Sequence, residues 1–371
     1  MKYIPFLTIT AAALFLNGCD TMTTEYNPTT DNHEEIYVSK DEIYSKFLEN
    51  FEKGSVSIGF DAPVDNNDVS SVIKEIKNKY PEYFWIDTSV TVFSESKGHT
   101  TCKFNIINDY TADELQTMHN ELQAAAENII SAMPAGLDDY GKALYVHDAI
   151  AETTFYDTSK TGIDSIGLWD TAYGCLVEGK AVCSGYSYGF QYIMNQLDIE
   201  CGVISGKAIN NSSYDTNSGD DTIGHAWNYV KINGRNYWVD VTWDDIDDTY
   251  DTEADSVHTF FLVNDERLLQ TRTIDADQNY VPACYTMDDN YHIRNNSFLN
   301  DYNKEEIGNI MAASADKKMA EIMFSSKESY NIAINALFEK GELWELSDYV
   351  LFSDYVSYIL DDDMKTIVIF F

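Results

Sequence analysis

The sequence predicts an α+β fold in which a helix carrying a cysteine packs on an antiparallel sheet carrying a histidine and an aspartate. Two strand-like runs, 225–232 and 235–243, are joined by Asn233-Gly234, the strongest short signal for a tight hairpin. A helix is predicted after Cys183, because apolar residues recur there at helical spacing. Smaller units with the order strand, helix, strand, strand flank this core on both sides.

The N-terminus has the pattern of an export signal. Lys2 precedes an apolar run over 4–15 and the sequence Leu16-Asn17-Gly18-Cys19. This pattern is typical of a signal peptide and is too short for a stable membrane span. Leu-x-Gly-Cys resembles the lipobox of bacterial lipoproteins, which implies lipidation of Cys19; an ordinary secretory signal with an incidental cysteine is the alternative.

We therefore divide the N-terminal part into a lipoprotein signal peptide, 1–19, and a flexible polar tether, 20–40. No other stretch is apolar enough to cross a bilayer, so the lipid anchor is the only expected membrane contact. The predicted location is the bacterial cell envelope, with the protein facing the periplasm or the cell exterior.

An N-terminal α/β domain is expected over 41–135. Thr111 and Glu114 have the spacing of a capping box, which opens a helix that runs to about residue 132, just before Pro134. The other predicted elements are helices 41–52 and 68–80 and strands 55–60, 83–93 and 100–107.

The catalytic core is expected over 136–300, with Asp138 capping its first helix, and a C-terminal α/β unit over 301–371. This unit is predicted to contain strand 319–324, helix 327–343 and strands 354–359 and 365–371, the same order as in the N-terminal domain. Sequence identity between the two units is negligible, so a degenerate repeat and chance both stay open. Each unit is interpreted as scaffold, with substrate docking as the alternative.

The predicted hairpin brings a base and its orienting group together. A two-residue turn places Ile232 opposite Arg235 and Trp227 opposite Asp240. His225 and Asp240 then become diagonal neighbours on one face, about 7–8 Å apart at Cα. Asn228 falls on the opposite face, so the register selects Asp240 as the partner of the imidazole.

Cys183 follows a run of glycines and small residues at the start of the predicted helix. The positive end of the helix dipole favours a thiolate there, and the unpaired Cys183 amide can help to bind an oxyanion. A thiol, a base and an orienting carboxylate form the set that nucleophilic acyl transfer requires. The second oxyanion donor is not identified; Trp169 and Tyr173 are candidates.

These residues resemble a known family. The segments 173–186, 224–228 and 239–245, with 142–148 and 155–157 upstream, are similar to the bacterial transglutaminase-like (papain-like) superfamily over roughly 137–266. The resemblance implies a papain-like core whose catalytic cysteine, histidine and aspartate are Cys183, His225 and Asp240. Cys175 is a departure, because the family more often has a small residue such as alanine there. The family includes proteases, cross-linking enzymes, deamidases, amidases and inactive members, so the resemblance implies chemistry but not substrate.

We expect a cysteine enzyme that hydrolyses peptide or isopeptide bonds through a thioester. The alternatives are a transglutaminase that joins glutamine to amines, and a catalytically silent surface binding protein. Candidate substrate contacts are Trp227, Tyr186 and Trp169, and the alternative for Trp227 is packing within the domain. No cofactor or metal is expected, and His147 and His258 are interpreted as structural histidines.

Composition limits the partners. The 371-residue chain has a formal net charge of −38, which argues against nucleic acids and anionic membrane surfaces. A protein or peptide substrate is expected; the charge favours a cationic one, although a merely solvated acidic surface is the simpler interpretation. Beyond Cys19 and Cys183 there remain Cys102, Cys175, Cys201 and Cys284, whose three possible disulfide connectivities the sequence leaves open.

Overall fold

The computed structural model describes residues 37–94, 98–161, 166–209, 222–246, 254, 256–276, 278, 280–353 and 356–371. The predicted signal peptide with Cys19, and the tether as far as residue 36, lie outside these ranges and stay predictions. Within the described ranges, no helix combines the length and the apolar composition needed to cross a bilayer.

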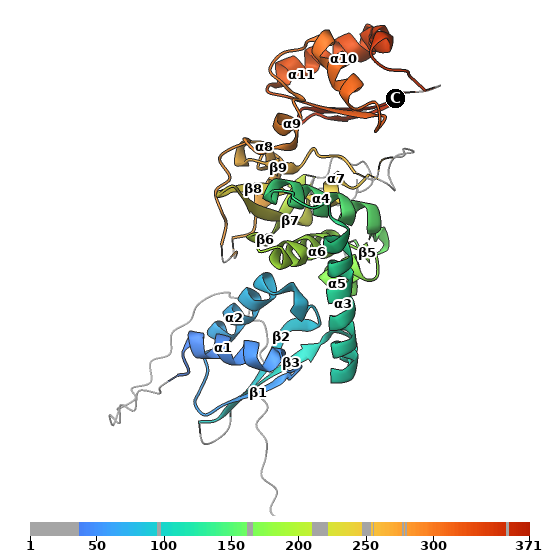
Figure 1. Ribbon diagram of the computed structural model, residues 1–371. Helices are drawn as coiled ribbons and strands as arrows, with labels where there is room; N and C mark the ends of the chain where they lie inside the picture. The colour runs from blue at the N-terminus through green and yellow to red at the C-terminus, as the bar shows by residue number, and fades with distance from the viewer. Residues whose placement is uncertain are drawn as a thin grey trace, which may run out of the picture. The chain divides into compact units, whose positions relative to one another are not determined.

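The N-terminal unit is a three-stranded antiparallel sheet with two helices on one face (Figure 1). The strand order is β1-β3-β2, and the predicted elements are confirmed. Phe47 and Phe104 meet with their rings edge-on, 4.8 Å apart at the centroids, and anchor α1 to the sheet. The bounds are α1 Lys40–Phe51, β1 Ser57–Phe60, α2 Asn66–Lys79, β2 Ile86–Ser94 and β3 Thr100–Ile106.

The long helix α3, Ala112–Ala132, begins with the predicted capping box. The Thr111 amide donates to Glu114 Oε2 over 2.7 Å, and the Glu114 amide donates back to Thr111 Oγ1. The helix contacts α5, Ala172–Leu176, in the core, and Tyr173 of α5 donates to Glu121 of α3 over 2.6 Å. Thus α3 packs on the core, although it was assigned to the N-terminal domain from the sequence.

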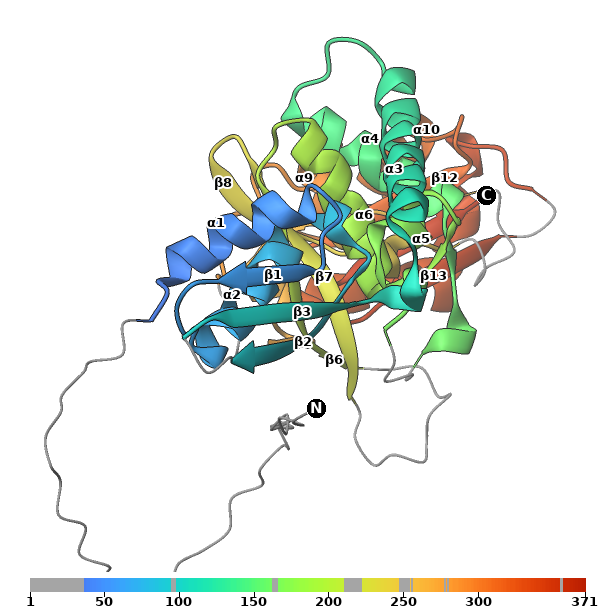
Figure 2. The ribbon, with the colours of Figure 1, turned by 90° about the horizontal axis from the view of Figure 1, so that it is seen from below.

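The core combines helices with a five-stranded antiparallel sheet of order β10-β6-β7-β8-β9, which confirms the α+β class. Helix α6 lies along β7 on the sheet face that carries Asn228, whose Nδ2 donates to the Ser187 carbonyl over 2.9 Å (Figure 2). The bounds are α4 Asp139–Thr153, β4 Phe155–Tyr156, β5 Lys180–Ala181, α6 Cys183–Gln196, β6 Cys201–Ile209, β7 Thr222–Ile232, β8 Arg235–Val239, α7 Val241–Asp244, β9 Phe261–Val263, α8 Asp265–Leu268, β10 Arg272–Ile274 and α9 Tyr291–Arg294.

One predicted strand ends early. The run 235–243 was expected to be extended throughout, but β8 stops at Val239 and the chain turns into α7. Asp240 is the N-cap of α7, and its backbone carbonyl accepts from the Trp243 amide over 3.2 Å. The tendency of aspartate to cap helices overrides the β propensity of the residues that follow it.

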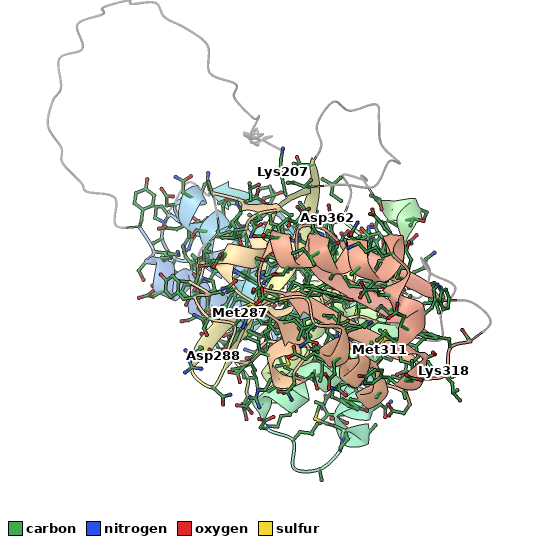
Figure 3. All side chains as sticks on the ribbon, turned by 90° about the horizontal axis from the view of Figure 1, so that it is seen from above. Lys207, Met287, Asp288, Met311, Lys318 and Asp362 are labelled. Carbon is green, nitrogen blue, oxygen red and sulfur yellow. The ribbon has the colours of Figure 1, made fainter. Side chains whose placement is uncertain are left out.

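The C-terminal unit repeats the topology of the N-terminal unit. Its sheet order is β11-β12-β14-β13, so its first, third and second main strands lie side by side, as in β1-β3-β2. The bounds are α10 Lys304–Ala313, β11 Phe298–Leu299, β12 Met319–Phe324, α11 Lys327–Ile334, β13 Ser357–Asp361 and β14 Thr366–Phe370. Figure 3 views the molecule from the side of this unit, with Met311 of α10 and Asp362 after β13 labelled.

The predicted helix 327–343 is interrupted. It ends as an α-helix at Ile334 and continues as a π-helical turn, Asn335–Glu339. Gly341 then adopts a left-handed conformation with φ of 78°, and a 3-10 helix, Glu342–Asp348, follows. Glycine takes this conformation at little cost and commonly ends helices, which explains why the helical run stops before residue 343.

Candidate active site

The hairpin brings His225 and Asp240 together as predicted. Ile232 pairs with Arg235 and Asn228 with Val239, and Asn233 and Gly234 both have positive φ, 51° and 77°. His225 Nε2 lies 2.8 Å from Asp240 Oδ2, and both side chains are buried. The predicted register is therefore confirmed, and the carboxylate fixes the orientation of the imidazole.

Arg272 is a third member of this pair that the sequence did not reveal. Its Nη2 donates to Asp240 Oδ2 over 2.7 Å from β10, at the edge of the sheet. The guanidinium lies 4.0 Å from the centroid of the Trp243 ring and has no exposed surface. Arg272 thus holds the oxygen that His225 uses, and it keeps the buried carboxylate charged.

These contacts set the protonation of the pair. Burial disfavours the imidazolium, but the charge and the hydrogen bond of Asp240, together with a hydrogen bond to Cys183, raise the pKa of His225 to about 9. Burial also opposes ionisation of Asp240, yet His225 and Arg272 hold the pKa of that carboxyl below its usual range. The site therefore favours a charged imidazolium beside a charged carboxylate.

Cys183 is the first residue of α6, as expected, and it is half-buried. A helix of this length presents its unpaired amides and the positive end of its dipole to the thiol. Gly185 allows the helix start to approach the chain upstream, because a Cβ there would lie 2.5 Å from the Trp169 carbonyl oxygen. With His225 Nε2 bonded to Asp240, Nδ1 is the ring nitrogen left for the thiol.

The other described cysteines are buried and free, so none of the disulfides left open by the sequence forms. Burial raises the pKa of Cys102 to about 11 and that of Cys175 to about 12. Cys175 also contacts the Thr154 hydroxyl at 3.4 Å. Cys175, the unusual thiol near the site, is thus held in the core, and Cys183 is the described cysteine that solvent reaches.

Residues 124–243 match the Transglutaminase-like superfamily, and this range contains all three proposed catalytic side chains. This chain contains a transglutaminase-like domain. The matched range begins inside α3, consistent with the packing of that helix on the core.

Solved structures similar to this chain have low identity. One is a crystal structure of a TGase, with 14% identity, a TM-score of 0.29, and 50% of each chain covered. Another is a candidate cysteine protease from Cytophaga hutchinsonii, with 12% identity, a TM-score of 0.26, and 53% of this chain and 79% of that chain covered. A third is a candidate protease from Parabacteroides distasonis, with 10% identity, a TM-score of 0.22, and 40% of this chain and 35% of that chain covered. The chain thus spans about half the length of the TGase structure, and no curated protein matches it.

Two of the three predicted substrate contacts of the transglutaminase-like domain are wrong. Trp227 has no exposed surface and packs against Trp238, with ring centroids 6.5 Å apart, because its sheet face is covered by other apolar side chains. Tyr186 is also fully buried, and its hydroxyl lies 2.6 Å from the Thr154 carbonyl oxygen. Trp169 is half-buried and stays a candidate, with Lys160 Nζ 4.3 Å from its ring centroid.

Tyr156 is a further residue near the nucleophile of the transglutaminase-like domain. Strands β4 and β5 pair in parallel and place Tyr156 opposite Ala181, two residues before Cys183. Burial, with the nearby Cys183 and Asp240, raises the pKa of its phenol to about 12, and the phenol interacts with the Cys183 backbone amide. Tyr173, suggested from the sequence as an oxyanion donor, instead donates to Glu121. A strand of two residues gives too weak a sequence signal to predict the position of Tyr156.

A cavity of about 330 Å³ lies beside the start of α6. Ser184, the residue after Cys183, is on its wall and donates to Asp170 Oδ1 over 2.8 Å. Lys77 also lines the cavity, and burial lowers the pKa of its amine. The cavity is lined by the residue that follows Cys183 but not by Cys183, His225 or Asp240; its lining also includes Lys74, Tyr80, Tyr83, Phe84, Thr171 and Tyr188.

Proposed function

We propose that this chain is a cysteine acyl-transfer enzyme of the bacterial cell envelope, anchored through Cys19, that hydrolyses peptide or isopeptide bonds. One observation carries the proposal. A half-buried thiol at a helix N-terminus interacts with His225, and Nε2 of that imidazole lies 2.8 Å from a buried aspartate. This is the arrangement of nucleophile, base and orienting group that acyl transfer requires.

The reaction has two balanced steps. In the first, the Cys183 sulfur attacks the amide carbonyl carbon while His225 holds the thiol proton. The carbon–nitrogen bond then breaks, the imidazolium gives its proton to the leaving amine, and a thioester remains. In the second, His225 takes a proton from water, the hydroxide attacks the thioester, and the carboxylic acid leaves as the sulfur recovers a proton. Asp240 and Arg272 stay charged throughout and hold the ring.

Two donors are available for the oxyanion that forms in each step. The Cys183 amide has no partner within α6 because it lies at the start of the helix, and the Tyr156 phenol, which interacts with this amide, lies next to it. Because burial raises the pKa of Tyr156 to about 12, the phenol stays protonated at neutral pH and can donate. In this proposal Tyr156 is the second oxyanion donor, which could not be identified from the sequence.

A turnover assay tests the proposal. The purified chain is incubated with a library of peptides and isopeptides, with and without a primary amine, and the products are identified by mass spectrometry. New carboxylates that depend on Cys183 support hydrolysis, whereas amides formed only with the added amine support the transglutaminase alternative. Cys183→Ser should abolish turnover, and Cys102→Ala, which removes a distant buried thiol, should not. If the wild type neither turns over any substrate nor has a reactive Cys183, a silent binding protein is the better account.

A further inference from the structure

A second group of potential ligands lies outside the Cys183 site. His147 and Asp148 in the second half of α4 meet His258, which precedes β9. Asp148 Oδ1 lies 2.9 Å from His147 Nδ1 and 3.0 Å from His258 Nε2, and all three ligand atoms fall within 4.8 Å of one another. Two imidazoles and a carboxylate thus converge on one point.

We propose that His147 Nδ1, His258 Nε2 and Asp148 Oδ1 bind one divalent transition-metal ion of the zinc class. Imidazole nitrogen and carboxylate oxygen suit Zn²⁺, Co²⁺ and Ni²⁺, whereas Ca²⁺ and Mg²⁺ require mostly oxygen ligands. Three protein ligands leave a fourth position for water. The site was not predicted from the sequence, where both histidines were interpreted as structural.

The far nitrogen of each ring is held by a buried carboxylate. His147 Nε2 lies 3.2 Å from Asp244 Oδ2, and His258 Nδ1 lies 2.7 Å from Glu321 Oε1. Histidines that bind metals are usually oriented in this way, with the second nitrogen bonded to a carboxylate or carbonyl. Both rings are therefore directed so that their other nitrogen faces Asp148.

The outer carboxylates are themselves fixed by backbone amides. The Phe260 amide donates to Asp244 Oδ1 over 3.0 Å, and the His258 amide donates to Glu321 Oε2 over 2.7 Å. The Tyr291 ring stacks on His258 at a centroid distance of 3.9 Å and sets the plane of that imidazole. This rigidity distinguishes the cluster from a surface group of carboxylates, which would bind cations weakly and without selectivity.

The spacing suits a metal after a small adjustment. Bonds of about 2.0–2.1 Å in a tetrahedral site separate neighbouring ligand atoms by roughly 3.4 Å. The two distances from Asp148 Oδ1 to the ring nitrogens, 2.9 and 3.0 Å, must therefore open by a few tenths of an ångström, and the two ring nitrogens themselves lie within 4.8 Å of each other. The Asp148 side chain is 45% exposed while the two histidines are buried, so the ion can enter from the Asp148 side and water can fill the fourth position.

Such an ion would join three parts of the chain. Its ligands come from α4 and from the segment before β9, and Glu321 ties the site to β12 of the C-terminal unit. Asp244 ends α7, and Asp240 is the N-cap of the same helix. Metal binding therefore stabilises the helix that begins at the proposed catalytic carboxylate, but the site itself does not depend on the proposed function.

Metal titration of the full chain tests the proposal. Because Cys183, His225 and Asp240 are also potential ligands, the titration is made in the wild type and in Cys183→Ala. After treatment with a chelator, each should bind one Zn²⁺ in competition with a chromophoric chelator, in excess Ca²⁺ and Mg²⁺. Co²⁺ should give visible bands without the thiolate charge-transfer absorption of a sulfur ligand.

Variants assign the ligands. Asp148→Asn should weaken Zn²⁺ binding by more than about 100-fold, and Glu321→Gln by about 10–100-fold, the range for a lost outer partner. Glu152→Gln, one turn further along α4 and exposed, is the matched control and should bind as the wild type does. Thermal unfolding verifies that each variant folds, and Zn²⁺ should raise the melting temperature of the wild type but not of Asp148→Asn. The proposal would be overturned by any of three results: the wild type does not bind Zn²⁺ stoichiometrically, binding is lost only in Cys183→Ala, or Asp148→Asn binds as the wild type does.

Discussion

Alkylation should single out Cys183 among the described thiols. The thiolate is the reactive form, and each pKa increase of one reduces its fraction about tenfold. Burial raises the pKa of Cys102 from 9.0 to about 11, and that of Cys175 to about 12. At neutral pH their thiolate fractions are therefore about 100-fold and about 1000-fold below that of an unperturbed thiol. Poor access in the core slows both residues further.

The assay is iodoacetamide labelling at mildly acidic to neutral pH, with peptide mapping of each cysteine at several times. Cys183 should be modified at least about 100-fold faster than Cys102 and Cys175. His225→Ala should slow Cys183 toward an ordinary exposed thiol while the circular dichroism spectrum stays nearly unchanged. Modification of Cys175 before Cys183, or an inert Cys183 in a folded chain, would refute the catalytic assignment.

Three further changes test other parts of the account. Asp240→Asn should leave the far-ultraviolet circular dichroism intact but reduce turnover by up to about 10⁴-fold, because His225 loses its orienting carboxylate; a loss below tenfold would contradict that role. Arg272→Gln should lower the free energy of unfolding by about 3–5 kcal/mol, measured by urea denaturation, because it removes one of the two cations that pair with the buried Asp240 carboxylate; a neutral effect would show that the ion pair contributes little. Cys19→Ser should release the protein from the membrane fraction, and an unmodified Cys19 in the intact mass of membrane-purified wild type would exclude the lipid anchor.

Turn chemistry and helical spacing, which act over a few residues, were sufficient to predict much of the candidate active site. The Asn233-Gly234 turn fixed the hairpin register, and with it the choice of Asp240 over Asn228. Helical spacing after Cys183 placed the nucleophile at a helix start, where the structure has it. These signals act over a few residues, so a single sequence records them fully.

Contacts between distant segments could not be predicted. Arg272 reaches Asp240 across 32 residues, and His258 reaches Glu321 across 63, with no pattern in the chain to pair them. The burial of Trp227 depends on which elements cover its side of the sheet, which period-two alternation does not specify. In the two flanking units, the order of the elements could be predicted from the sequence but their function could not. Their strand orders, β1-β3-β2 and β12-β14-β13, agree although their sequences do not.

Trapping the thioester tests the central claim most directly. The chain is mixed with an activated acyl ester, quenched in acid, and analysed by intact mass and peptide mapping. The account predicts one acyl group per chain, located on Cys183, removed by hydroxylamine, and absent from Cys183→Ala. Turnover without any adduct on Cys183, or an adduct that forms equally in Cys183→Ala, would contradict the account.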